Sequence, residues 1–206
     1  MFGIEHTVDT ICTEQPIAAQ VAGELVAGSY IGQAFKAEYN GLYRVEVYLS
    51  AGARQSAGPL ILHIRTAQDA GTDLIAVKVN SEQVHNNAYQ PFEFLPLRHS
   101  AGQHLHFLLE APQAVPGNAL AVWGTMEDIY ADGEAILYGV KNTAIRDLTF
   151  RLCYKPSLRE KALILLDRLA SNKPSLWGDK LLYVGMGLTY LVLLYFLIIR
   201  TTAIGK

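Results

Sequence analysis

The chain has 206 residues, a formal net charge of −2 and two cysteines. Because this balance lacks a basic patch among aromatic residues, it argues against a nucleic-acid binder, and we expect no nucleic-acid partner. The length allows one domain with a sizeable core plus a further segment, and two cysteines are too few for a disulfide framework.

Residues 1–27 are a mixed segment that we expect to join the domain behind it. The Ala- and Val-rich stretch 18–28 fits either a strand or a short helix. No basic region followed by an apolar run stands at the start, so we predict no signal peptide. Cys12 and Cys153 lie near the two ends of the domain, where first and last strands of a sandwich can be neighbours. We expect two free thiols, with one disulfide as the open alternative.

Residues 28–155 are predicted to form a jelly-roll-like antiparallel β-sandwich, so the fold class is mainly β. Short runs rich in Val, Ile, Tyr and Phe alternate there with turn residues such as Gly, Pro, Asn and Asp, which is typical of this architecture. The predicted strands are 29–37, 42–49, 59–66, 73–80, 89–96, 104–111, 119–124, 134–138 and 147–154.

Alternation assigns the two faces of three of these strands, because successive side chains of a strand point to opposite sides. The predicted core face carries Tyr43, Val45, Val47, Leu49, Leu105, Phe107, Leu109, Leu148, Phe150 and Leu152. The predicted outer face carries Arg44, Glu46, His104, His106, Glu110, Asp147, Thr149, Arg151 and Cys153.

One histidine pattern points to metal chemistry. His104, His106, Glu110 and Gly117 resemble the first metal motif of the cupins, which are also small β-barrels; two imidazoles and a carboxylate at this spacing suit a metal ion. The chain departs from the family because no histidine follows His106. We therefore expect no metal, and keep His104, His106 and Glu110 as alternative ligands.

Carboxylates gather between Glu127 and Glu134, with Asp128 and Asp132 among them. Oxygens of this kind can bind Ca²⁺ in a loop, although a solvated turn is the commoner role. No nucleophile elbow, phosphate loop, dinucleotide fingerprint or Cys-x-x-Cys occurs. We therefore expect no cofactor and no enzyme activity.

A sugar-binding surface is the second candidate site. Its residues would be Asn86, Asn87, Tyr89, Trp123 and Tyr130, with Tyr138 as a further aromatic. Aromatic faces can stack on sugars and amides can bond to hydroxyls. The alternative is that Trp123 is a half-buried core residue.

The pattern over residues 28–154 resembles the galactose-binding-like jelly rolls. The resemblance is carried by Gln33-x-Phe35, Gly41 to Val45, Phe92-x-Phe94, the Gly117-Asn118 turn and Asp147-Leu148. It implies a binding module without catalysis, and it transfers no ligand residue to this chain.

Residues 156–173 are predicted to form an amphipathic helix. Ser157 and Glu160 make a capping box at its start. The helix either packs on its own domain or lies in a membrane interface, where Arg159, Lys161, Arg168 and Lys173 would face anionic headgroups.

A linker, 174–180, leads to a predicted transmembrane helix over 181–200 and a short tail, 201–206. No charged residue occurs from Leu181 to Ile199, and this length suffices to cross a bilayer. Trp177 and Lys180 stand at the predicted interface. Gly185, Gly187 and Thr189 are small residues that let another helix approach closely.

Three functions follow from this organisation. The favoured one is a non-catalytic, single-pass accessory or scaffolding subunit of a larger membrane complex, with lipid and other transmembrane helices as partners. The flanking cations and the absence of a signal peptide place its domain in the cytoplasm. The alternatives are a membrane-anchored carbohydrate-binding module displayed outside the cell, whose partner is a glycan, and a cupin-like metal protein.

Overall fold

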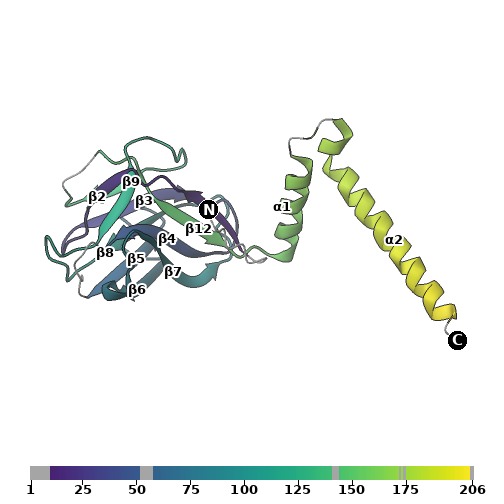
Figure 1. Ribbon diagram of the computed structural model, residues 1–206, viewed down its shortest axis with the longest axis horizontal. Helices are drawn as coiled ribbons and strands as arrows, with labels where there is room; N and C mark the ends of the chain where they lie inside the picture. Colours follow the sequence, from purple (N-terminus) through teal and green to yellow (C-terminus); the bar gives the residue numbers. More distant parts are fainter. Residues whose placement is uncertain (1–9, 52–57, 141–143, 172, 174, 205–206) are drawn as a thin grey trace. The chain divides into compact units, whose positions relative to one another are not determined.

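The computed structural model describes residues 10–51, 58–140, 144–171, 173 and 175–204. The chain divides into two compact units, Met1–Pro156 and Ser157–Lys206. The first unit consists of two antiparallel sheets packed as a sandwich (Figure 1). The predicted mainly-β sandwich is therefore confirmed.

The smaller sheet has five strands in the order β10-β3-β8-β5-β6. Their bounds are β3 (Tyr30–Lys36), β5 (Pro59–Arg65), β6 (Ile75–Asn80), β8 (His104–Glu110) and β10 (Ala135–Tyr138). The predicted ranges differ from these by at most two residues at either end. The composition of the stretch Ser56-Ala57-Gly58-Pro59 also predicts a turn, and this stretch lies partly outside the described residues.

The larger sheet has seven strands in the order β1-β12-β4-β9-β11, with β2 paired to β9 and β7 paired to β4. Their bounds are β1 (Ile11–Gln15), β2 (Gln20–Glu24), β4 (Leu42–Ser50), β7 (Ala88–Leu97), β9 (Ala121–Thr125), β11 (Asp147–Leu148) and β12 (Phe150–Tyr154). A short 3-10 helix, η1 (Ser81–Gln83), leads from β6 toward β7. The segment before residue 28 thus supplies two strands and no helix within its described part.

The core lies between the two sheets and is rich in aromatic side chains. Phe107 of the smaller sheet meets Phe150 of the larger one with ring centroids 5.6 Å apart. Val45 and Val47 are fully buried, whereas Arg44 and Glu46 between them are partly exposed. The alternation predicted for β4 and β8 is therefore confirmed, and it is what buries one face of each sheet.

The predicted outer face is wrong for the strand over residues 147–154, where Asp147, Thr149 and Cys153 are buried. The strand is divided at Thr149. Its N–H donates to the carbonyl of Trp123 in β9, and its carbonyl accepts from Tyr48 in β4. The chain therefore passes from one neighbouring strand to another, and side chains near the division are enclosed instead of facing solvent.

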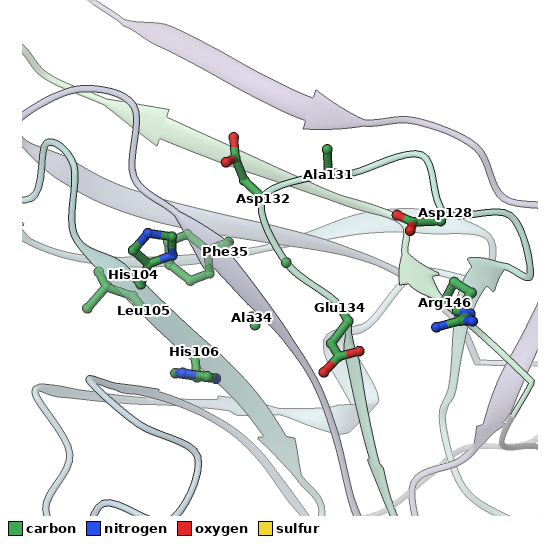
Figure 2. A pocket seen from close by; sticks show the side chains of 11 residues that line it. Ala34, Phe35, His104, Leu105, His106, Asp128, Ala131, Asp132, Glu134 and Arg146 are labelled. Carbon is green, nitrogen blue, oxygen red and sulfur yellow. The ribbon is translucent and has the colours of Figure 1, made fainter.

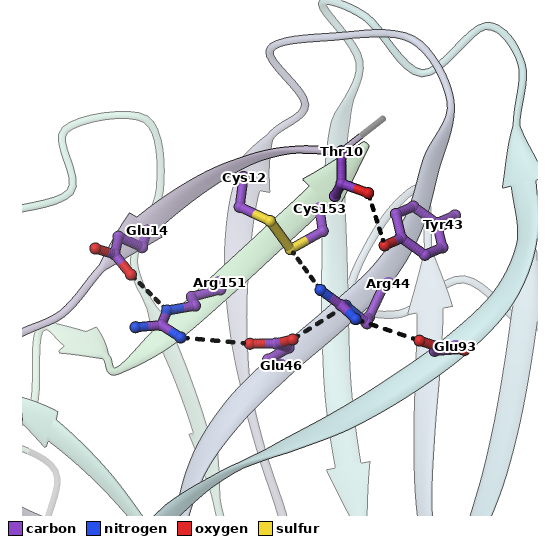
Figure 3. Close-up of a disulfide and its surroundings, with 9 residues drawn as sticks. All are labelled: Thr10, Cys12, Glu14, Tyr43, Arg44, Glu46, Glu93, Arg151 and Cys153. Carbon is purple, nitrogen blue, oxygen red and sulfur yellow. Dashed lines mark hydrogen bonds and ion pairs between the residues drawn. A yellow bond between two sulfur atoms is a disulfide. The ribbon is translucent and has the colours of Figure 1, made fainter. Parts of the chain in front are cut away.

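The expectation of two free thiols is also wrong. Cys12 of β1 lies directly opposite Cys153 of β12, and the two form a disulfide with Cα atoms 4.2 Å apart (Figure 3). Closely spaced pairs of this kind occur at the non-hydrogen-bonded positions of antiparallel strands. The disulfide joins the first described strand to the last strand of the sandwich.

The second unit contains α1 (Leu158–Ala170), a 3-10 turn η2 (Ser175–Gly178) and α2 (Lys180–Ile204). The capping box is confirmed: the Ser157 hydroxyl accepts from the Glu160 N–H, and the Glu160 carboxylate accepts from the Ser157 N–H. The helix ends at Ala170, earlier than predicted. α2 continues through residues 201–204, where the sequence predicts a tail. Residues 205–206 lie outside the described part.

α2 is long and apolar enough to cross a membrane. The stretch Lys180–Arg200 has a mean hydropathy of 2.2, and none of it is buried. At its start, the Tyr183 hydroxyl donates to the carbonyl of Trp177 over 2.9 Å and accepts from Lys173. Lys180 forms an ion pair with Asp167 of α1. These contacts order the approach to α2.

Candidate functional site

The three alternative metal ligands do not come together. His104 and His106 lie at one end of β8, but Glu110 lies at the other end, where its carboxylate is 3.4 Å from Nε2 of His63. Among the described residues, no three His, Cys, Asp or Glu side chains are placed to share a metal ion. The geometry therefore gives the cupin-like alternative no support.

The two histidines instead line a pocket beneath the 126–134 loop, the connection between β9 and β10. The pocket has a volume of about 380 Å³. Figure 2 shows the histidines of β8 on one side and the loop, with Asp132 and Glu134, on the other. Asp128 and Arg146 lie at the far end, and Phe35 and Leu105 also contribute to the lining.

This pocket has an excess of unpaired negative charge. Within the described part of the chain, the carboxylates of Asp128, Asp132 and Glu134 make no hydrogen bond or ion pair. The negative charge of the pocket also affects a residue outside it. The pKa of the Glu38 carboxyl is raised chiefly by burial and in addition by the charge of Asp132. Such a surface favours a cationic ligand.

His106 is half-buried at the pocket wall. Burial lowers the pKa of its imidazole and neighbouring His104 lowers it further, while Asp69 acts in the opposite direction. Its Nδ1 is enclosed and has no hydrogen-bond partner among the described residues. A neutral imidazole has one donating and one accepting nitrogen, and a nitrogen enclosed in this way is out of reach of a ligand.

The predicted sugar surface is largely assembled on the outer face of the larger sheet. Tyr48 of β4 packs edge-to-face on Tyr89 of β7, with centroids 5.1 Å apart, and on Trp123 of β9, at 6.4 Å. The indole N–H of Trp123 donates to the Asn87 carbonyl oxygen over 3.2 Å. We call Tyr48, Tyr89, Trp123 and Asn87 the aromatic face.

The neighbouring turn holds the aromatic face in place. Asn86 accepts hydrogen bonds from the Ser50 hydroxyl and the Ala51 N–H. Asn87 has a φ of 50°, a left-handed conformation that asparagine tolerates better than most residues. The turn therefore directs the Asn87 side chain toward Trp123.

A row of alternating charges borders the aromatic face and runs across four strands (Figure 3). Glu14, Arg151, Glu46, Arg44 and Glu93 follow one another from β1 through β12 and β4 to β7. The Arg151 guanidinium lies 3.9 Å from the centroid of the Tyr89 ring. It therefore covers part of that ring and connects the charges to the aromatic residues.

Tyr130, the fifth predicted member of the sugar surface, lies elsewhere. Its ring packs on the buried ring of Phe150 at 5.2 Å, and its hydroxyl donates to the backbone carbonyl of Lys36. Burial raises the pKa of this phenol, against the opposing effect of that hydrogen bond. Tyr130 therefore supports the core next to the 126–134 loop.

The membrane-related candidates lie in the second unit. Arg159, Lys161 and Arg168 are on α1, Lys173 and Trp177 are in the connection, and Lys180 begins α2. A Cβ added to Gly185 or Gly187 would meet nothing within 4 Å. Thr189 donates its hydroxyl hydrogen to the Gly185 carbonyl of its own helix, so it is already satisfied there.

The sequence matches no known protein-family model, and no curated protein matches it significantly. Reasoning from the sequence missed the roles of Tyr48, Arg146 and Arg151. The alternation of β4 places Tyr48 on the outer face, which was a usable signal. Arg146 carried no signal, because its position depends on how the 126–134 loop folds over β3.

Proposed function

We propose that this chain is a non-catalytic, membrane-anchored carbohydrate-binding module whose sandwich faces an oxidising compartment. The observation that carries the proposal is the aromatic face, in which Tyr48, Tyr89 and Trp123 meet from three strands beside Asn87. Large rings offer apolar area to the C–H faces of a sugar, and polar tips bond to its hydroxyls.

The shape of this surface suits an extended glycan. The aromatic face lies on a sheet, and its edge-to-face rings are held by neighbouring strands. Such a fixed surface loses little conformational entropy when it binds. The pattern-level resemblance to galactose-binding-like jelly rolls supports the same class of function.

The disulfide supports the proposal that the sandwich lies in an oxidising compartment. Disulfides persist in oxidising spaces and are rare in the cytosol, and Cys12–Cys153 uses both cysteines of the chain. The flanking cations favour the opposite orientation, but the positive-inside bias is overridden by long domains. We therefore give the disulfide more weight than the charges in this proposal.

The second unit supports anchoring. α2 has the length and hydropathy of a membrane span, and Leu158, Leu165 and Leu169, which share one face of α1, are exposed. An amphipathic helix can place such leucines in the interface while Arg159 and Arg168 meet anionic headgroups. The anchor would thereby keep the aromatic face near the membrane on which it acts.

A glycan-array experiment tests the proposal with the full chain in nanodiscs. We expect binding to a restricted set of neutral glycans and a loss of about tenfold in affinity for Trp123→Ala. Tyr138→Ala is the matched control, because Tyr138 is an exposed aromatic that stacks on Tyr30 of the other sheet. The proposal would be refuted if the chain bound no glycan, or if Trp123→Ala and Tyr138→Ala lost the same affinity for the glycan.

An accessory subunit of a membrane complex is the second candidate function. The open space around Gly185 and Gly187 favours it, because small residues allow two helices to approach closely. Gly185→Leu with Gly187→Leu should then abolish co-purification of a partner in mild detergent, whereas Val192→Leu should not. A chain that purifies alone in every variant would exclude this function.

A further inference from the structure

We propose that the pocket beneath the 126–134 loop binds a small amino sugar or similar amino-polyol, a ligand with one ammonium group and several hydroxyls. This site lies on the smaller sheet, apart from the residues of the aromatic face, so the inference does not depend on glycan binding there. Its volume of about 380 Å³ falls in the range of small-molecule clefts.

The charge of the lining selects the ammonium group. Three carboxylates, Asp128, Asp132 and Glu134, stand against the single guanidinium of Arg146. None of the three is neutralised by a described residue. An ammonium group beside Asp132 or Glu134 would make a charge-assisted hydrogen bond, which is stronger than a neutral one.

The spread of the carboxylates argues for an organic ligand over a metal ion. A bound Ca²⁺ needs six to eight oxygens converging on one point. In the described residues, no three ligating side chains converge in this way. A ligand of several ångströms can instead reach the separated groups one at a time.

The remaining lining suits hydroxyl groups. Arg146 only donates hydrogen bonds, whereas the imidazole rings of His104 and His106 can donate or accept. Such a mixture matches a polyol, whose hydroxyls do both. A simple aliphatic amine would leave the Arg146 guanidinium without a partner.

The pocket is held in place before any ligand arrives. The Asp147 carboxylate accepts from the N–H groups of Ile129 and Tyr130, over 2.7 and 2.9 Å. The Ala34 N–H donates to the Glu134 carbonyl over 2.9 Å. A Cβ on Gly133 would overlap the carbonyl oxygen of Ala34, so the loop lies directly on β3. A fixed wall of this kind reduces the entropic cost of binding.

Calorimetric titration of the full chain in nanodiscs tests the site with three sugars of similar shape. We expect saturable binding of glucosamine, and binding of glucose and N-acetylglucosamine weakened at least about tenfold, because neither carries the ammonium group. Equal affinity for the three sugars, or no binding of glucosamine, would overturn the proposal. Stoichiometric Ca²⁺ binding that displaces glucosamine would also overturn it, in favour of a metal site.

Single substitutions test whether glucosamine binds in the pocket beneath the 126–134 loop. Asp132→Asn and Glu134→Gln should each weaken glucosamine about threefold to tenfold. Glu127→Gln is the matched control, because Glu127 is an exposed carboxylate of the same loop that does not line the pocket. Trp123→Ala should also leave glucosamine binding unchanged, which separates this site from the aromatic face. The assignment would be refuted if Trp123→Ala abolished glucosamine binding while Asp132→Asn left it unchanged.

Discussion

At the scale of the residue, the carboxylate of Asp147 connects the sandwich to the 126–134 loop. It is fully buried and accepts hydrogen bonds from two backbone amides of the loop and from the Gln33 amide. The Gln33 carbonyl oxygen in turn accepts from the Leu148 N–H. Every group in this network therefore has a partner, which is what makes a buried carboxylate tolerable.

Replacing Asp147 with asparagine should destabilise the sandwich by about 2 kcal/mol, because an amide NH₂ would face the NH₂ of Gln33 and leave buried groups unpaired. Urea unfolding of the variant and the parent measures the difference. Asp128→Asn is the control, since Asp128 is an exposed carboxyl in the same loop, and it should change stability by less than about 0.5 kcal/mol. Equal midpoints for Asp147→Asn and the parent would contradict this account.

The His106 imidazole makes stability depend on pH. Its pKa in the folded chain lies below the usual 6.5, chiefly because of burial. As the pH falls through 6.5, the unfolded chain binds this proton first, so the folded state loses stability until the pH also passes the lower, folded pKa.

His106→Gln should therefore make the free energy of unfolding less dependent on pH between pH 7 and pH 5. The change cannot exceed about 1.4 kcal/mol per pH unit, which is the limit for one proton. Urea unfolding at several pH values measures the slope, and His85→Gln, on an exposed loop, is the control variant. An unchanged slope in His106→Gln would show that this imidazole is not the group responsible.

At the scale of the element, β1 shows why part of the fold escaped prediction. The runs that became β4 and β8 alternate clearly between apolar and polar residues, so their core faces followed from the sequence. β1 is short and mostly polar, and nothing local marks it as a strand. Its pairing with β12 depends on tertiary register, and so does the disulfide between Cys12 and Cys153. The pocket under the 126–134 loop was missed for the same reason: it joins residues far apart in sequence.

Removing the disulfide should loosen this pairing at the edge of the larger sheet. A cross-link between residues so distant in sequence restricts the unfolded chain strongly, and its loss typically costs about 2–4 kcal/mol. Urea unfolding with and without reductant should show this difference. The Cys12→Ser/Cys153→Ser double variant should have the same free energy of unfolding as the reduced parent, and reductant should not change it. Two reactive thiols in the unreduced, purified chain would contradict the assignment.

At the scale of the whole molecule, the proposed function assigns recognition to the sandwich and attachment to the helical unit. Both candidate binding surfaces belong to the sandwich, one on each sheet, while the apolar helix belongs to the other unit. The side of the membrane on which the sandwich lies then decides which ligands it can meet. Maleimide labelling of single cysteines placed at exposed positions would establish that side.

This division predicts that residues 1–156 fold without the helices. Every residue of the buried core cluster lies between Ala22 and Tyr154, so removing the second unit takes no side chain from the core. Urea unfolding of this fragment should give a free energy within about 1 kcal/mol of that of the sandwich in the full chain, since the core cluster is kept whole. A fragment ending at residue 146 lacks β11 and β12, the latter lying between β1 and β4, and should not fold. A 1–156 fragment that stays unfolded while the full chain folds would show that the helices stabilise the sandwich directly.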